Sequence, residues 1–563
     1  MIYLQKKGAF TMIEIKAVSS LEKILMTDDY NKFEQLHKIK ALRGERVSFQ
    51  LLIKNLYDEK RKVYANVWVG DEFKKYARVS RVGHVPVRLA TFLEGADHNY
   101  LSKDPGVYPD VLYPVTPTDD IPCEIYSAAS VMITIDLPKN IKSGEHTIEV
   151  FARDNKSEQT QSVKVTLDVK KTVIPKNELL FTQWFHCDSI ASYFNVPMMS
   201  KKHWSLIEKY IKTAARTGIT MLLTPMFTPP LDTAVGGERP TMQLVGVKKC
   251  GEKYSFDFTL LDKWFKLCKK YGIEHFEMSH LYTQWGVTNC PKIIVNENGQ
   301  AKKMFGWQTD AHGDVYKNFL SQYLPALTAH LKELGIADNC YFHISDEPSV
   351  SPEKPDLENY RKAREFVAPY LKDFKIMDAL SNIEFYKTGL VDIPVCATHH
   401  IEPFMNEDIS ERWAYYCCYP VGENYSNRFL AMPSWRTRVI GIQMYANDIV
   451  GFLHWGYNFY YSERSKYKID PYQITDGDNA WPAGDPFSVY PYNNGAIESI
   501  RTVVFYEGIQ DVMILSALEA KIGKAAVKDM LTNLAGGKIS FKDYPQNKEF
   551  ITLVHDTAID MLG

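Results

Sequence analysis

The sequence predicts a multi-domain protein in which an N-terminal β-sandwich precedes a (β/α)8 barrel of the TIM type with long βα loops and a helical C-terminal tail. The chain has 563 residues, more than one ordinary domain holds. Short, alternating, β-branched runs fill the segment before residue 176, and strand-like and helical patterns alternate after residue 179. We therefore expect a β-sandwich domain at 1–175, a catalytic barrel at 176–517 and a helical extension packed on the barrel at 518–563.

The composition excludes several classes of protein. Lys and Arg number 66 and Asp and Glu 68, so a net charge of -2 provides no basic field for nucleic acid or an anionic membrane. With 45% hydrophobic and 24% charged residues, the chain is of ordinary globular composition. No apolar run approaches the roughly 18 residues that span a bilayer. We expect no nucleic acid partner and no membrane insertion.

The cysteines and the N-terminus indicate a reducing compartment. The nine cysteines are scattered and contain no Cys-x-x-Cys pair, which argues against a zinc ribbon or a thioredoxin-type site. The apolar run within residues 1–10 is shorter than a signal peptide requires. We therefore expect a cytoplasmic protein with reduced thiols.

The strands of the first domain are short and alternate between apolar and polar residues. Lys142 to Val150 is typical of a turn that leads into a strand, and Pro175 lies in a linker that closes the domain. The segment 85–122 is rich in Pro, Asp and Tyr and is predicted to be a long ordered loop. The clearest strands are expected at 47–53, 63–69, 130–136 and 161–169.

Eight strand-like runs, each followed by a helical pattern or a long loop, indicate the barrel. The strands are expected at 180–186, 220–224, 275–280, 340–345, 375–379, 392–398, 413–418 and 451–456. The helices are expected at 204–217, 260–271, 316–334, 357–370 and 434–447, with a tail of helices that ends at 548–562. Long loops are expected at 227–255, 281–315 and 457–499.

The strongest chemical signal is a pair of acids, Asp346 and Glu347, directly after the fourth predicted strand. Catalytic residues of barrels lie at the carboxyl ends of the strands. Pro348 ends the hydrogen bonding between this strand and its neighbours, because proline has no N–H. Neighbouring carboxyl groups can adopt different protonation states, which glycoside hydrolysis requires. The alternative is a helix cap or an ion pair.

The adjacency of the two acids limits the mechanism. Consecutive Cα atoms lie about 3.8 Å apart, so the acids are badly placed to straddle an anomeric carbon as two carboxyl groups about 5–5.5 Å apart do. They suit a substrate whose own 2-acetamido oxygen attacks that carbon. Asp346 would then orient the acetamido N–H, and Glu347 would protonate the leaving oxygen.

Other polar residues at predicted strand ends are candidate sugar contacts, with burial in the core as the alternative. Trp455 offers an indole face for a pyranose, and Tyr415 offers a hydroxyl for the acetamido oxygen. A metal site is not expected, because neither a His-x-His after the first strand nor a His-Glu-x-x-His occurs. We expect no cofactor. The remaining candidates are His186 and Asp188 after the first strand, His280, Gln284 and Trp285 after the third, and Tyr457 after the eighth.

Six motifs follow one another along the barrel segment. They are Thr182-Gln-Trp-Phe-His-Cys-Asp188, Phe227-Thr-Pro-Pro-Leu-Asp-Thr233 with 238–241, Ser279-His-Leu-Tyr-Thr-Gln-Trp-Gly286, His343-Ile-Ser-Asp-Glu-Pro348, Gly451-Phe-Leu-His-Trp-Gly-Tyr-Asn458, and Trp481-Pro-Ala-Gly-Asp485 leading to 499–501. Taken together, they resemble glycoside hydrolase family 123, the retaining β-N-acetylgalactosaminidases.

The resemblance implies that Asp346 and Glu347 act by substrate assistance. It implies a glycan substrate with terminal β-linked N-acetylgalactosamine, as in glycosphingolipid oligosaccharides, and its motifs add Trp184 and His343 to the expected substrate contacts. Two other interpretations stay open, a non-catalytic carbohydrate-binding barrel and a metal-dependent barrel hydrolase.

Overall fold

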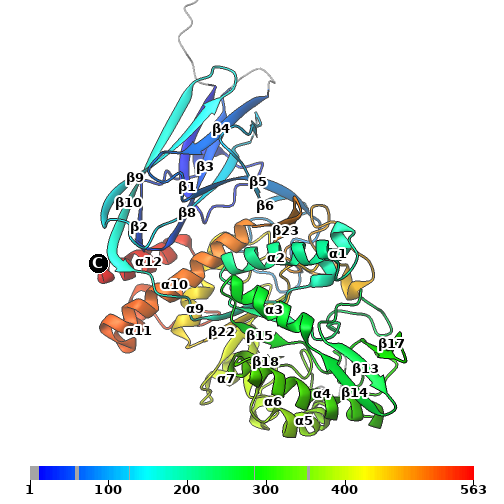
Figure 1. Cartoon of the computed structure of the whole chain (residues 1–563). Coiled ribbons are helices and arrows are strands. Elements are labelled where there is room, and N and C mark those ends of the chain that lie inside the picture. Colours follow the sequence, from blue (N-terminus) through cyan, green and yellow to red (C-terminus); the bar gives the residue numbers. More distant parts are fainter. Residues whose placement is uncertain (1–11, 57–61, 126, 285, 351–355) are drawn as a thin grey trace, which may run out of the picture. The chain divides into compact units, whose positions relative to one another are not determined.

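The computed structural model describes residues 12–56, 62–125, 127–284, 286–350 and 356–563 (Figure 1). Contacts divide the chain into two compact units, and both units are assembled from segments that are distant in the sequence. The first unit consists of Met1–Glu178, Gly422–Ala446 and Ile497–Gly563. The second unit consists of Leu179–Val421 and Asn447–Ala496.

Two five-stranded sheets form most of the first unit and share one hydrophobic core. Alternate residues of the strands, such as Phe49, Leu51 and Val67, are buried in this core. The strand-rich N-terminal region is thus confirmed. In spatial order the first sheet consists of β1 (Ile13–Ser19), β3 (Arg46–Asn55), β8 (Ala129–Asp136), β5 (Ala77–Val87) and β6 (Gly106–Pro114). The second sheet consists of β2 (Lys38–Arg43), β10 (Thr160–Val173), β9 (Gly144–Asp154), β4 (Val63–Val69) and β7 (Ile121–Cys123).

The prediction of a long loop at 85–122 is wrong for its first residues, which end β5, and for two further segments. Strands β6 and β7 lie in this range, and each forms the edge of its sheet. Pro109 in β6 and Pro122 in β7 have no N–H to donate to a ladder. An edge strand tolerates proline because one side of the strand has no neighbour. The prolines therefore indicated sheet edges rather than a loop.

The helices of the first unit come from the later parts of the chain. Gly441 and Gly508 let two of these helices cross closely, because a Cβ on Gly441 would lie 1.9 Å from the carbonyl oxygen of Gly508. The last helix contacts β10 and β2. The unit therefore differs from the predicted division at 175 and 517. Its helices are α8 (Ser434–Arg438), α9 (Ile440–Ala446), α10 (Ile500–Ile522), α11 (Lys524–Ala535) and α12 (Lys548–Leu562), with the short 3-10 helix η1 (Tyr30–Lys32).

A closed barrel of eight parallel strands forms the centre of the second unit, and all eight predicted strands are confirmed. The interior is filled by side chains such as Leu223, Val395 and Leu453. Gly451 is required where it stands, because a Cβ there would lie 2.0 Å from the ring of Trp413 on the neighbouring strand. The strands are β11 (Leu180–Gln183), β12 (Met221–Thr224), β15 (His275–Met278), β18 (Cys340–Phe342), β19 (Lys375–Leu380), β20 (Ile393–Ala397), β21 (Trp413–Tyr415) and β22 (Gly451–His454).

The helices between the barrel strands are unequal, so the regular (β/α)8 alternation is only partly realised. Two of them, α6 (Glu384–Lys387) and α7 (Glu402–Met405), have four residues each. None of the described helices combines the length and the apolar character that crossing a membrane requires. The longer helices are α1 (Cys187–Phe194), α2 (Lys201–Arg216), α3 (Thr259–Lys270), α4 (Asp314–Glu333) and α5 (Asp356–Leu371), and the 3-10 helices of the unit are η2 (Ala337–Asn339), η3 (Thr398–His400) and η4 (Glu463–Ser465).

The long loops predicted after the barrel strands contain strands of their own. The loops after β12 and β15 together form a four-stranded sheet, and the loop after β22 leads to a two-stranded one. The first of these sheets consists of β14 (Lys253–Asp257), β13 (Gly246–Cys250), β16 (Ile293–Glu297) and β17 (Gln300–Phe305), and the second of β23 (Tyr490–Tyr492) and β24 (Gly495–Ile497).

We predict that the ion pair of Arg501 and Asp110 contributes strongly to the stability of the first unit. Both side chains are fully buried, and Arg501 donates Nε to Oδ1 at 3.0 Å and Nη2 to Oδ2 at 2.8 Å. Arg501→Met leaves a buried carboxylate without its counter-charge. Urea unfolding should show a loss of about 3–5 kcal/mol. The double variant Asp110→Leu/Arg501→Met should recover part of this loss, and a double variant as unstable as the sum of both single variants would contradict the pairing.

Candidate active site

A cavity of about 160 Å³ lies at the carboxyl ends of the barrel strands. Its walls come from seven of the eight barrel strands or from the loops that follow them, as expected for the catalytic face of a barrel. Its walls are acidic, aromatic and sulfur-containing, with a few aliphatic side chains. The lining residues are Trp184, Leu231, Asp232, Gln284, Asp346, Glu347, Ala379, Tyr415, Cys417, Cys418, Leu453, Trp455 and Trp481.

Asp346 and Glu347 lie together in this cavity, four and five residues after the end of β18. Asp346 is 9% exposed and accepts a hydrogen bond from Nε2 of Gln284. Glu347 accepts one from the hydroxyl of Tyr415 at 2.5 Å. Each acid therefore has its own donor, and both donors are residues that the sequence predicted for the site.

The backbone of Glu347 has a left-handed conformation, with φ of 43°. This region is unfavourable for a residue with a side chain, and it is unusual before a proline such as Pro348. Such strain persists only where the surrounding structure holds it, and strained residues concentrate at functional sites. The conformation is thus a second observation, independent of residue type, that points to Glu347.

The environment raises the pKa of both acids. Burial and the neighbouring charge of Glu347 raise the pKa of Asp346 well above its usual range, against the hydrogen bond from Gln284. The side chain of Glu347 reaches solvent in the open cavity, but desolvation by the surrounding protein still raises its pKa. The hydrogen bond from Tyr415 acts in the opposite direction and lowers the pKa. Because ionisation of one acid disfavours ionisation of the other, the pair titrates as a unit.

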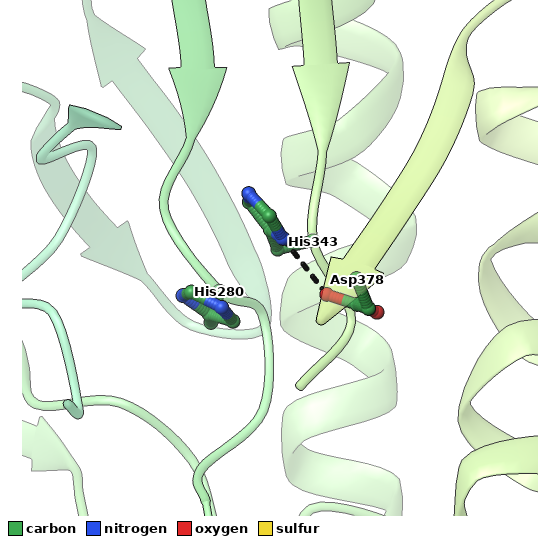
Figure 2. A group of neighbouring side chains, drawn as sticks. All are labelled: His280, His343 and Asp378. Carbon is green, nitrogen blue, oxygen red and sulfur yellow. Dashed lines mark hydrogen bonds and ion pairs between the residues drawn. The ribbon is translucent and has the colours of Figure 1, made fainter. Parts of the chain in front are cut away.

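A charged histidine lies in the buried layer beneath the acids. The side chain of His343 is fully buried, with Nδ1 2.8 Å from Oδ1 of Asp378 (Figure 2). Its Nε2 lies 3.0 Å from Oε2 of Glu277. Burial alone would lower its pKa, but the hydrogen bonds to Asp378 and Glu277 raise the pKa to about 10. His343 is therefore an imidazolium that donates from both ring nitrogens, and it does not line the cavity.

The two carboxylates beside His343 connect it to the cavity. Oε2 of Glu277 also accepts the indole N–H of Trp184 at 2.9 Å, and Trp184 forms part of the cavity wall. Oδ2 of Asp378 accepts the backbone N–H of Ile344 at 3.1 Å, two residues before Asp346. The network thus fixes one wall of the cavity and the chain segment that carries the acids.

Among the described residues, His280, His343 and Asp378 form the one group of three or more His, Cys, Asp or Glu side chains whose ligand atoms could hold a common metal ion. Their ligand atoms are within 4.8 Å of one another. The ring of His280 stacks on that of His343 with centroids 4.4 Å apart. Both nitrogens of His343 already contact carboxylates. A metal ion would have to break one of these ion pairs. The arrangement therefore fits a hydrogen-bonded network better than a metal site.

The predicted contacts His186 and Asp188 are used in a buried ion pair. Asp188 accepts two hydrogen bonds from Arg239, at 2.9 and 2.7 Å, and Nη2 of Arg239 lies 3.1 Å from Nδ1 of His186. Burial and the charge of Arg239 lower the pKa of His186 to about 3. Neither residue lines the cavity. They hold the loop of Arg239 against the start of α1.

The other predicted contacts divide into those that reach the cavity and those that do not. Tyr457 is fully buried, stacks on Phe185 and donates its hydroxyl to the carbonyl of Tyr210 at 3.0 Å. His280 is buried against His343, and Trp285 lies outside the described residues. The predicted substrate contacts that line the cavity are Trp184, Gln284, Tyr415 and Trp455.

Sequence reasoning missed two polar or aromatic residues of the cavity that come from loops. Asp232 follows β12, its backbone N–H donates to Oε1 of Gln284 at 2.6 Å, and burial raises its pKa to about 6. Trp481 packs edge-on against Trp455, with centroids 4.9 Å apart. Both positions occur in motifs of the resemblance, but no periodicity marks their side chains as cavity residues.

A comparison with protein families identifies the family of the chain. The family model described as Glycoside hydrolase 123, catalytic domain, matches residues 184–518. The chain belongs to glycoside hydrolase family 123. It is accordingly an enzyme that acts on glycosides, and the resemblance seen in its motifs is confirmed.

One solved structure shows the same fold. A family 123 glycoside hydrolase from Clostridium perfringens, described for glycolipid glycan hydrolysis, is 16% identical, with a TM-score of 0.72 over 98% of this chain and 97% of that one. A β-glucuronidase from Parabacteroides merdae is 10% identical, with a TM-score of 0.26 over 79% of this chain and 47% of that one. An endo-β-1,4-mannanase from Thermotoga petrophila is 13% identical, with a TM-score of 0.35 over 60% of this chain and 77% of that one. Both TM-scores are too low to indicate a common fold. No curated protein matches the sequence.

We predict that His343 makes the stability of the second unit depend on pH. Its pKa rises from 6.5 to about 10 on folding, so its contribution is complete below pH 6.5 and is lost as the pH rises through about 10. His343→Gln removes this contribution. The difference in free energy of unfolding between the parent and this variant should be largest near pH 6 and shrink towards pH 10 in urea titrations. The exposed His400→Gln is the control, and a difference independent of pH would refute the charged state.

Proposed function

We propose that this glycoside hydrolase releases terminal β-linked N-acetylgalactosamine with retention of configuration, and that the 2-acetamido group of the substrate is the nucleophile. The adjacency of Asp346 and Glu347 in one cavity carries the proposal. Consecutive residues from one strand end are poorly placed to lie on opposite sides of the anomeric carbon. In substrate assistance one acid contacts the acetamido N–H and the other contacts the leaving oxygen, and no carboxylate of the enzyme has to lie behind the anomeric carbon. Adjacent residues can meet this requirement.

In the proposed first step, the acetamido oxygen attacks C1 and the bond from C1 to the glycosidic oxygen breaks. Glu347 donates its proton to that oxygen, which leaves as the alcohol of the aglycone. Asp346 accepts the acetamido N–H and stabilises the positive charge on the resulting oxazolinium. Desolvation raises the pKa of both acids, and the charge of Glu347 raises that of Asp346 further, so the coupled pair retains a proton. We assign this proton to Glu347 during the reaction, which leaves Asp346 as the carboxylate.

In the proposed second step, a water molecule attacks C1 from the face that the aglycone left. Glu347, now a carboxylate, accepts a proton from the water, and the bond from C1 to the acetamido oxygen breaks. Two inversions give net retention. Gln284 holds Asp346 by its hydrogen bond, and the hydroxyl of Tyr415 passes from Glu347 to the acetamido oxygen when the substrate enters.

The aromatic wall supports a sugar ligand. Trp184, Trp455 and Trp481 line the cavity, and indole faces stack on the apolar face of a pyranose. The indole N–H of Trp455 is held by Asp485 at 2.9 Å, so this ring is fixed before the substrate binds. The similar enzyme from Clostridium perfringens was described for glycolipid glycan hydrolysis, and we propose glycosphingolipid oligosaccharides as the natural substrate class.

The activity is tested with nitrophenyl glycosides. We expect release of nitrophenol from the β-N-acetylgalactosaminide and very slow release from the β-galactoside, whose 2-hydroxyl cannot form an oxazoline. Successive fluorination of the N-acetyl methyl group weakens the nucleophile, so kcat/KM should fall steeply along the series. Equal turnover of the galactoside, or a sugar trapped covalently on a carboxylate of the enzyme, would overturn substrate assistance. Loss of activity in a chelator would favour a metal-dependent hydrolase instead.

The role of Glu347 is tested by Glu347→Gln. General acid catalysis contributes about 10²–10⁴ in rate, so kcat/KM should fall by at least this factor on a natural glycan with a poor leaving group. A nitrophenyl glycoside should lose less, because its leaving group needs less protonation. Glu333→Gln, at an exposed position near the end of α4, is the matched control and should behave as the parent. Similar losses on both substrates would contradict an acid role.

A further inference from the structure

Two adjacent cysteines lie in the wall of the catalytic cavity. Cys417 and Cys418 follow β21 directly after the segment that carries Tyr415, whose hydroxyl donates to Glu347. Both line the cavity and are partly exposed. Their sulfur atoms are 3.8 Å apart, and none of the nine cysteines is in a disulfide. The cavity therefore presents two thiols side by side next to a proposed catalytic acid.

The spacing of the two sulfur atoms suits a tetrahedral metal ion. With a Zn–S distance of about 2.3 Å and a tetrahedral angle, two thiolates on one ion lie about 3.8 Å apart. The pair already has this separation. A disulfide fits less well, because Cα atoms of adjacent residues are about 3.8 Å apart, closer than the roughly 4.4–6.8 Å of ordinary disulfides.

The charge of the cavity also suits a cation. Asp232, Asp346 and Glu347 contribute three carboxyl groups, and no Lys, Arg or His is among the described residues that line the cavity. Field lines from like charges concentrate in a cleft with low-dielectric walls and raise the local concentration of counter-ions. Water or a carboxylate oxygen of the cavity would complete the coordination of an ion held by two sulfurs.

We propose that Cys417 and Cys418 form a bidentate site for a thiophilic divalent cation of the Zn²⁺ or Cd²⁺ class, and that an ion bound there inhibits the enzyme. Each thiol releases its proton to solvent as its sulfur–metal bond forms, and no atom changes oxidation state. The ion blocks the cavity wall beside Tyr415 and Glu347. Binding stands on the geometry alone, whereas inhibition rests on the proposed function.

Binding is tested by titrating the full-length protein with Cd²⁺ and following the ultraviolet charge-transfer absorption of a cadmium–thiolate. We expect a band that saturates at one ion in the parent and is lost in Cys417→Ser/Cys418→Ser. Cys250→Ser, which removes an exposed thiol from β13, is the matched control and should keep the band. An unchanged band in the double variant would overturn the site, and so would the absence of any thiolate band in the parent.

A second measurement does not depend on the variants folding. In the parent, Cd²⁺ should protect Cys417 and Cys418 from alkylation by iodoacetamide, whereas Cys250 should react equally with and without the ion. Peptide mass mapping distinguishes the three positions. Unprotected Cys417 and Cys418 at a saturating concentration of Cd²⁺ would refute the site.

Inhibition is measured with Zn²⁺ on each protein relative to its own metal-free rate. The single variants Cys417→Ser and Cys418→Ser should need at least tenfold more Zn²⁺ for half inhibition, and a chelator should restore the parent fully. Equal sensitivity of parent and variants would overturn the inhibitory role. If the parent hydrolyses none of the glycosides but shows the thiolate band, the proposed function fails while the cation site stands.

Discussion

The architecture of the cavity depends on the imidazolium of His343 between Glu277 and Asp378. The three side chains come from three neighbouring strands, β15, β18 and β19, at the point where these strands end. All three side chains are fully buried, and an isolated charge in such an environment is strongly unfavourable. One positive charge shared by two carboxylates makes the cluster tolerable, and it locks three strand ends in one register.

This constraint explains how a strained residue is held in place. Asp378 accepts the backbone N–H of Ile344, and the hydroxyl of Ser345 donates to the carbonyl of Thr283 at 3.0 Å. The chain is thus anchored immediately before Asp346, and Glu347 takes up its left-handed conformation at the end of an anchored segment. A catalytic group is accurate only if the residues that support it are fixed, and here the support is ionic and buried.

The sequence predicted the barrel strands and the acid pair because both signals are local. A buried strand is a short apolar run, and Asp346 and Glu347 follow such a run directly. The sequence alone did not distinguish the polar residues that face the cavity from those that are buried elsewhere. His186 and Asp188 resembled sugar ligands until Arg239, 51 residues after Asp188, was found paired with them. Asp232 and Trp481 reach the cavity on loops whose paths depend on distant contacts, such as that of Asp232 with Gln284.

The acidity of the cavity has one electrostatic origin and two consequences. In the proposed reaction a neutral sugar becomes an oxazolinium, so the positive charge exists only near the transition state and beyond. Carboxylates placed around it stabilise that state more than the bound substrate, which is the condition for catalysis. The ionised acids of the cavity also attract small cations, and Cys417 and Cys418 add soft ligands. Sensitivity to thiophilic ions therefore follows from the field that the proposed catalysis requires, and removing the thiols rather than the acids separates the two effects.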